Sequence, residues 1–291
     1  SFLFLLLPIL ISSLILRGTK VSKDRSPKWM VSYHTIDKKE FQCAGTIISP
    51  RVIHTAAHCL KSASKENYIK LTLNDYEADV REVDDIKRNG YDWYLRSRSH
   101  GDRYKQDDYG LIFLDRPVSV CEDRVDTLMA PLIVDSLVFP TETTTIIPNE
   151  KNCTVTGWGL NEFDKYEHPL HFARTSKFYT TKGMIIVMKY KNNAKACNGD
   201  SGSPLICNAN NIPILIGNIA GGVSDDPEAV EDASTDSEKC DLRNDIYSLI
   251  YRQMPVLEKQ LRKRKLWKEF VETQKRCARF YQSENGGKWI H

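Results

Sequence analysis

The chain has 291 residues, of which 41% are hydrophobic and 27% are charged, and its formal net charge is +3. This composition predicts a soluble globular protein of one large domain or two ordinary ones. The net charge is too small to indicate a nucleic-acid-binding protein, so we expect no nucleic-acid partner.

The chain opens with an apolar run at residues 2–16, interrupted only by Pro8, Ser12 and Ser13. The run is short for a helix that spans a bilayer, which needs about 20 apolar residues. Its length and the small residues near its end are typical of a secretory signal peptide. We expect residues 1–14 to be a signal peptide and the protein to be secreted without a stable membrane anchor. A membrane anchor or a buried N-terminal strand is the alternative.

Short apolar runs separated by polar turns fill the middle of the chain. Runs this short, bounded by Gly, Pro, Asn and Asp, favour an all-β protein. They lie at residues 29–33, 45–48, 111–114, 134–139, 154–158, 184–188, 205–207 and 212–219.

Two later segments differ in composition from this pattern. Residues 224–241 are rich in Asp and Glu and poor in apolar residues, which predicts an exposed, mobile loop. At residues 257–277, apolar residues recur at helical spacing while Lys and Arg fill the other face. We therefore expect a basic amphipathic helix and tail at 257–291, packed on the domain surface. Docking to the acidic loop, an anionic partner, or cleavage at the basic cluster are the alternatives.

The strongest chemical signal lies at residues 197–204, which read Cys-Asn-Gly-Asp-Ser-Gly-Ser-Pro. A serine hydroxyl such as that of Ser201 is a poor nucleophile until a base takes its proton. Glycines on either side would let backbone N–H groups approach the attacked carbonyl and stabilise the developing oxyanion. Taken alone, the segment is also compatible with a turn of small residues that has no function.

Two other segments supply the groups that such a serine needs. His58 lies in the sequence Thr-Ala-Ala-His-Cys, and its small-residue setting makes it a candidate base. Asp108 precedes the apolar run at 109–114, so we expect its carboxylate to be partly buried. A buried carboxylate needs a partner, and an imidazole N–H is a suitable one.

These segments resemble the motif blocks of the trypsin/chymotrypsin-like serine proteases, peptidase family S1. Residues 153–159 resemble a fourth block of that family, and residues 29–32 resemble its first core strand. The order His, Asp, Ser also fits. The resemblance covers roughly residues 15–255 and implies a protease domain at 15–256, followed by the helical extension.

The resemblance implies two perpendicular six-stranded β-barrels with the active site between them. Ser201 would be the nucleophile, His58 its base, and Asp108 the group that orients His58. The N–H groups of Gly199 and Ser201 would form the oxyanion hole. This mechanism needs no metal and no cofactor.

Eight cysteines beside a signal-like segment predict disulfides formed in an oxidising compartment. Because no CxxC pair is present, the sequence gives little support for a zinc site. The resemblance implies three pairs, Cys43–Cys59, Cys153–Cys207 and Cys197–Cys240. Cys121 and Cys277 have no counterpart in the family, and we predict that they pair and tie the C-terminal helix to the barrels.

Asn152 begins the sequence Asn-Cys-Thr, which is an N-glycosylation sequon. We regard Asn152 as a candidate glycosylation site.

The specificity pocket departs from the family pattern. Lys195 occupies the position of the aspartate with which trypsin binds Arg and Lys side chains, so we expect basic side chains to be repelled. Asp245 falls where the family usually has glycine, and we expect it to pair with Lys195, because an unpaired buried lysine is costly. Ala220 and Gly222 lie in the segment that is commonly Ser-Trp-Gly, and the missing tryptophan removes one wall of the neighbouring subsite.

In the family, a newly freed amino terminus binds the aspartate before the nucleophile, here Asp200. The nearest match to the expected terminus begins at Ile15, but it follows Leu14 rather than a basic residue. The resemblance therefore implies Asp200 as the partner of the amino terminus and leaves the activating cleavage unexplained.

Together these features predict a secreted, monomeric serine endopeptidase of non-tryptic specificity. Its expected partners are protein or peptide substrates and a protein inhibitor. The altered pocket and the unclear activation site favour an alternative, a catalytically inactive homologue that acts as a binding or regulatory module. An unrelated β-rich secreted protein is a third alternative.

Overall fold

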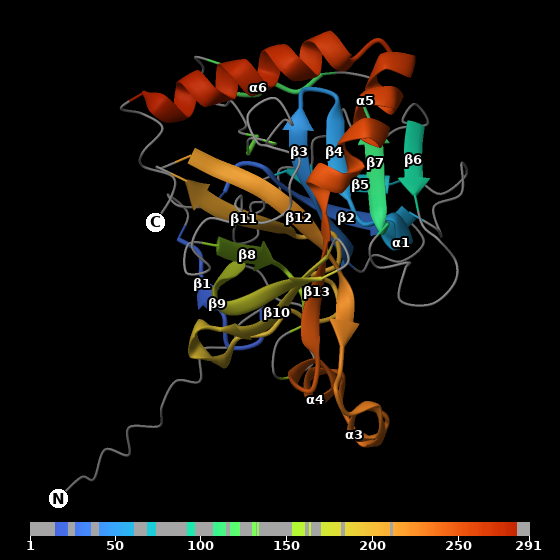
Figure 1. Cartoon of the computed structure of the whole chain (residues 1–291), viewed down its shortest axis with the longest axis vertical. Coiled ribbons are helices and arrows are strands. Elements are labelled where there is room, and N and C mark those ends of the chain that lie inside the picture. The colour runs from blue at the N-terminus through green and yellow to red at the C-terminus, as the bar shows by residue number, and fades with distance from the viewer. Residues whose placement is uncertain are drawn as a thin grey trace, which may run out of the picture.

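The computed structural model shows two antiparallel β-sheets, with two helices at the C-terminal end of the chain (Figure 1). The expected signal peptide at 1–14, the run at 134–139 and Asn152 lie outside the residues that the structure describes. The described residues are 15–22, 27–35, 41–60, 69–73, 92–96, 107–114, 117–122, 130–131, 133, 153–160, 163, 170–181, 184–209 and 212–283.

The first sheet has six strands in the order β5-β2-β3-β4-β7-β6. Val, Ile, Thr, Tyr and Phe favour strands, and β4 and β7, which consist mostly of such residues, are buried along their whole length. Helix α1 (Ala57–Leu60) begins two residues after β4 ends. The strands are β2 (Met30–Thr35), β3 (Phe41–Ser49), β4 (Val52–Thr55), β5 (Ile69–Leu73), β6 (Asp92–Arg96) and β7 (Tyr109–Phe113).

The second sheet has seven strands in the order β1-β9-β10-β13-β12-β11-β8. Pairing of β8 with β9 closes six of them into a barrel, so these six strands expose no free sheet edge. Short 3₁₀ segments follow β10 (Lys191–Asn193) and β13 (Ile250–Gln253). The strands are β1 (Thr19–Lys20), β8 (Cys153–Gly157), β9 (His171–Thr181), β10 (Met184–Tyr190), β11 (Pro204–Ala209), β12 (Ile212–Val223) and β13 (Asn244–Leu249).

The acidic segment at 224–241 was predicted to be an exposed, mobile loop. It is largely exposed, but the prediction of a loop was wrong, because the segment forms two short helices. Helix α3 spans Pro227–Asp232 and helix α4 spans Asp236–Asp241. Asp226 accepts a hydrogen bond from the N–H of Ala229, and a capping box links Thr235 and Glu238. Capping satisfies the first backbone N–H groups and lets a polar segment form a helix without a large buried face.

The C-terminal extension is helical, as predicted, but it contains two helices, α5 (Met254–Lys263) and α6 (Trp267–Gln282). Lys265, with a φ of 61°, breaks the chain direction between them. One face of each helix joins the core of the first sheet, and α6 crosses over that sheet in Figure 1. Of the helices in the described part of the chain, none has the length and hydropathy of a membrane span.

The fold therefore confirms the predicted class, an all-β protein built on β-barrels with a C-terminal helical extension.

Candidate active site

His58 and Asp108 are brought together by the pairing of β4 with β7. Thr55 at the end of β4 lies opposite Gly110 in β7, so α1, which follows β4, lies beside the start of β7. The Nδ1 of His58 lies 2.6 Å from Oδ2 of Asp108, and the backbone N–H of His58 donates to Oδ1 at 2.8 Å. Both carboxylate oxygens are thus bound to one residue, which fixes the plane of the imidazole.

The burial of the two side chains differs. Asp108 is fully buried, whereas 34% of the His58 side chain is exposed. Asn218 in β12 donates from Nδ2 to the backbone carbonyl of Asp108 at 3.1 Å, which links this site to the second sheet. Sequence analysis did not identify Asn218, because its role depends on a contact with a residue 110 positions away.

Ser201 lies where the second sheet docks on the first. Its backbone carbonyl accepts a hydrogen bond from Ala44 in β3 at 2.8 Å, and Thr55 donates from Oγ1 to the carbonyl of Ala44 at 2.7 Å. A Cβ on Gly202, whose φ is 81°, would overlap both Ala44 and Thr55, so only glycine allows this close approach. In the described part of the chain, no hydrogen bond joins Ser201 Oγ to His58, a bond that often tightens only when substrate binds.

The loop that carries Ser201 leaves two backbone donors free. The N–H of Asp200 donates to the carbonyl of Cys197 at 3.0 Å, and that of Gly202 donates to Ile219 at 2.9 Å. Within the described residues, the N–H groups of Gly199 and Ser201 have no acceptor. Gly199 has a φ of 96°, which the turn requires. Two such free donors beside a serine can bind an oxygen that develops negative charge.

Asp200 is buried beneath this loop. Its Oδ1 accepts from the N–H of Gly159 at 2.8 Å and its Oδ2 accepts from Cys197 at 2.9 Å. Burial raises the pKa of Asp200 to about 8, and the two hydrogen bonds oppose that rise. Ile15 and Leu16 are also fully buried, and the carbonyl of Leu16 accepts from the N–H of Lys195 at 3.1 Å.

The expected ion pair between Lys195 and Asp245 is not formed in the part of the chain that the structure describes. The Nζ of Lys195 donates to the backbone carbonyl of Arg243 at 2.6 Å. Asp245 accepts from the N–H of Ala196 at 3.1 Å. Burial raises the pKa of Asp245 to about 6, while Tyr190 and the charge of Lys195 act in the opposite direction. Each charge thus has its own polar partner.

The other two residues expected in the specificity pocket lie in β12. Gly222 is opposite Asp245 in the pairing of β12 with β13, and Ala220 is buried. A pocket of about 500 Å³ adjoins Lys195 and reaches Arg17, but Ala220 and Gly222 do not line it.

Two buried tyrosines next to this region were not predicted from the sequence. The hydroxyls of Tyr190 and Tyr247 lie 2.7 Å apart, and both pKa values are raised, above all by burial. Both residues sit in largely buried strands, β10 and β13, and no local sequence pattern distinguishes them from ordinary core residues.

The structure joins the eight cysteines in the four pairs expected from the sequence. Cys43, His58 and Cys59 offer donor atoms within 4.8 Å of one another, but the two sulfurs are bonded to each other, so this group is not a metal site. The disulfides are Cys43–Cys59, Cys121–Cys277, Cys153–Cys207 and Cys197–Cys240.

A closed barrel, a second sheet docked on it and a histidine paired with a buried aspartate define the class of trypsin-like proteins. The profile of the Trypsin family matches residues 15–235, which is more than half of the 291-residue chain, and the chain belongs to this family.

Curated relatives are similar over most of the same region. Kallikrein 1-related peptidase b27 of Mus musculus is 27% identical over 216 residues, covering 68% of this chain and 76% of that protein. The thrombin-like enzyme flavoxobin of Protobothrops flavoviridis is 26% identical over 214 residues, covering 68% and 74%. The ovochymase of Halocynthia roretzi is 26% identical over 191 residues, which span 62% of this chain but 11% of that protein.

Among solved structures, the mouse serine protease neuropsin is similar with a TM-score of 0.57 at 20% sequence identity. The match covers 85% of this chain and all of the neuropsin chain, and it supports the fold.

Proposed function

We propose that the chain is a secreted serine endopeptidase whose catalytic residues are His58, Asp108 and Ser201. The observation that carries the proposal is the bond of 2.6 Å between the buried carboxylate of Asp108 and Nδ1 of His58. This bond leaves Nε2 as the nitrogen that can act as a base, and the carboxylate stabilises the imidazolium that forms. Membership of the trypsin family supports the same chemistry.

In the proposed reaction, Ser201 Oγ attacks the carbonyl carbon of the peptide bond while His58 Nε2 takes the hydroxyl proton. The carbonyl oxygen becomes negative and accepts hydrogen bonds from the free N–H groups of Gly199 and Ser201. His58 then gives the proton to the leaving amine, which breaks the C–N bond and leaves an acyl-enzyme. Water, activated by His58, hydrolyses the ester and restores the serine.

An amino terminus at Ile15 is the proposed partner of Asp200. Ile15 is buried, and Leu16 pairs with Lys195, five positions before Asp200. A free ammonium group there would neutralise a buried carboxylate that otherwise has only backbone N–H partners in the described part of the chain. We propose that this ion pair between the ammonium group at Ile15 and Asp200 holds the N–H groups of Gly199 and Ser201 in a fixed position.

The proposed specificity is non-tryptic. The ammonium group of Lys195 would repel the basic side chains that trypsin accepts. We therefore propose protein or peptide substrates that are not cut after Arg or Lys, with a protein inhibitor as a further partner and a monomeric enzyme. The four disulfides support an oxidising, extracellular location.

The test is labelling of the purified protein, with its amino terminus at Ile15, by a fluorophosphonate, which reacts with an activated serine. Labelling that is lost in Ser201→Ala is the expected result.

The second candidate is an inactive binding module, favoured by the missing hydrogen bond between Ser201 and His58 in the described structure. Failure of the wild-type chain to react would remove the endopeptidase proposal and make the binding module the better-supported function.

A further inference from the structure

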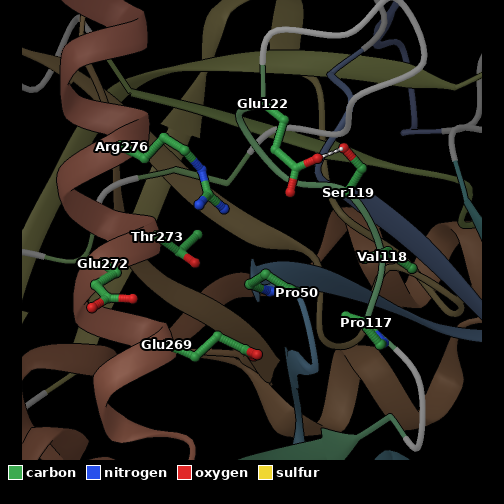
Figure 2. A pocket seen from close by; sticks show the side chains of 9 residues that line it. All are labelled: Pro50, Pro117, Val118, Ser119, Glu122, Glu269, Glu272, Thr273 and Arg276. Carbon is green, nitrogen blue, oxygen red and sulfur yellow. Dashed lines mark hydrogen bonds between the residues drawn. The ribbon is translucent and has the colours of Figure 1, made fainter.

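A groove of about 330 Å³ lies between α6 and the segment 117–122, and none of the three proposed triad residues lines it (Figure 2). Arg276 in α6 donates from Nε and Nη2 to the backbone carbonyl of Val120, at 3.1 and 2.8 Å. The disulfide Cys121–Cys277 joins the same two elements. The groove is therefore held open by fixed contacts at one end and has a defined shape.

Two buried oxygen atoms in the groove have no hydrogen-bond partner among the described residues. Thr273 is 1% exposed, its Oγ1 is unpaired, and Figure 2 shows its side chain pointing from α6 into the groove. Oε1 of Glu269, one helical turn earlier, is also buried and unpaired. Because an unpaired buried acceptor is costly, both atoms favour a ligand that brings hydrogen-bond donors.

The charge of the groove favours a cation. The carboxylates of Glu122, Glu269 and Glu272 line it together with one guanidinium, that of Arg276, whose Nε and Nη2 are bound to a carbonyl. Burial raises the pKa of Glu269, which shows that the neighbouring cations do not fully offset the loss of water.

The ion pairs that Glu269 and Glu272 make at the rim are long and partly exposed. Arg51 Nε lies 3.7 Å from Glu269, and Lys268 Nζ lies 3.8 Å from Glu272. These distances are long for hydrogen bonds, and the side chains are between 32% and 88% exposed, so both pairs are weak.

The spacing of the acceptors distinguishes an organic cation from a metal ion. A metal ion needs several donor atoms around one point, and in the described structure the carboxylates of the groove do not form such a group. Arginine carries five N–H donors in a planar fork that can reach separated acceptors. Its methylene stem can pack on Pro50, Pro117 and Val118, which form the apolar part of the lining.

We propose that this groove binds an arginine side chain of a partner polypeptide. The guanidinium donates to Glu269 and to Oγ1 of Thr273, and the carboxylates at the rim attract it. The site does not involve Ser201, so it is independent of the proposed catalytic function.

The experiment uses the full chain with Ser201→Ala, so that no peptide is cleaved. The probes are acetyl-Gly-Arg-Gly-amide and the same peptide with citrulline, which has the shape of arginine but no charge. NMR titration of backbone amides should show shifts at residues 118–122 and 269–276 with the arginine peptide. We expect the citrulline peptide to bind at least fivefold more weakly.

Variants of the two acceptors test the site itself. Glu269→Gln removes the charge and Thr273→Val removes the hydroxyl, each at nearly constant size, and each should weaken the arginine peptide at least fivefold. Glu258→Gln is the matched control, because Glu258 is exposed on α5 and bonds to Arg262. Equal affinity for the two peptides, wild-type affinity in both acceptor variants, or shifts confined to other surfaces would overturn the proposal. Amide spectra of the unliganded variants establish that they remain folded.

Discussion

At the residue scale, His54 is a buried group that should make stability depend on pH. Its ring is fully buried in β4, 5.0 Å from the ring of Tyr109, and neither ring nitrogen has a hydrogen-bond partner in the described structure. Burial lowers its pKa from 6.5 to about 3. The folded state therefore keeps His54 neutral at a pH where the unfolded chain binds a proton.

The sign of the effect follows from this difference. Above pH 6.5 His54 is neutral in both states, and between pH 6.5 and 3 only the unfolded chain is protonated, so stability falls as the pH falls. We predict that wild type loses about 2 kcal/mol between pH 6.5 and 5 that His54→Leu does not lose. Urea unfolding at both pH values measures the difference. An equal loss in the two proteins would contradict the assignment.

Asp108 allows a sharp residue-scale test of the proposed chemistry. Asp108→Asn keeps the size of the side chain but offers an NH₂ group to Nδ1 of His58, which favours the wrong tautomer. We expect the rate of fluorophosphonate labelling to fall by roughly 10³–10⁴-fold. Asp107→Asn is the control, because Asp107 accepts from Gln253 and, in the described part of the chain, His58 bonds to Asp108 instead. Similar rates in the two variants would remove Asp108 from the mechanism.

At the element scale, the helices and strands that were predicted correctly are those whose sequence signal is local. Short apolar runs predicted strands such as β7 and β11, and helical spacing predicted the C-terminal extension. The capping residues of α3 and α4 are also local, but the acidic composition outweighed them and led to the prediction of a loop. The hydrogen-bond partner of Lys195 could not be predicted from the sequence, because it is the backbone carbonyl of Arg243, which comes close only in the folded chain.

The junction between α5 and α6 gives an element-scale prediction. Lys265 has a φ of 61°, a left-handed conformation that costs a residue with a Cβ about 1 kcal/mol. Lys265→Gly should therefore stabilise the protein by several tenths of a kcal/mol, after the greater freedom of glycine in the unfolded chain is deducted. Lys259→Gly, at an exposed position in the middle of α5, should instead destabilise it by about 1 kcal/mol. Chemical denaturation measures both, and effects of the same sign would contradict this description of the junction.

At the scale of the whole molecule, the candidate site exists only where the two sheets meet. The first sheet holds His58 and Asp108, and the loop with Ser201 comes from the second. The hydrogen bonds from Ala44 to Ser201 and from Asn218 to Asp108 cross this boundary. The sequence motifs were therefore sufficient to predict the candidate catalytic residues. The contact of Asn218, which links the two sheets, could be identified only from the structure.

The prediction at this scale concerns a free amino terminus at Ile15, which would bind the loop that carries Asp200 and Ser201. The raised pKa of Asp200, about 8 against 3.8, means that the folded state holds a proton which the unfolded chain loses. The stability contributed by this proton is present below pH 4 and is lost as the pH rises through 8. A free ammonium at Ile15 would lower that pKa and remove most of this dependence below pH 8.

The test uses a chain with the recognition site of a specific protease placed directly before Ile15, so that the same protein can be measured before and after cleavage. We expect cleavage to raise the rate of fluorophosphonate labelling at least tenfold and to flatten the stability profile between pH 5 and 8. In Asp200→Asn, which has no carboxylate to pair with the ammonium, cleavage should change neither quantity. If cleavage activates this variant as much as wild type, the new terminus acts elsewhere, and the buried carboxylate serves only to bind the N–H groups of Gly159 and Cys197.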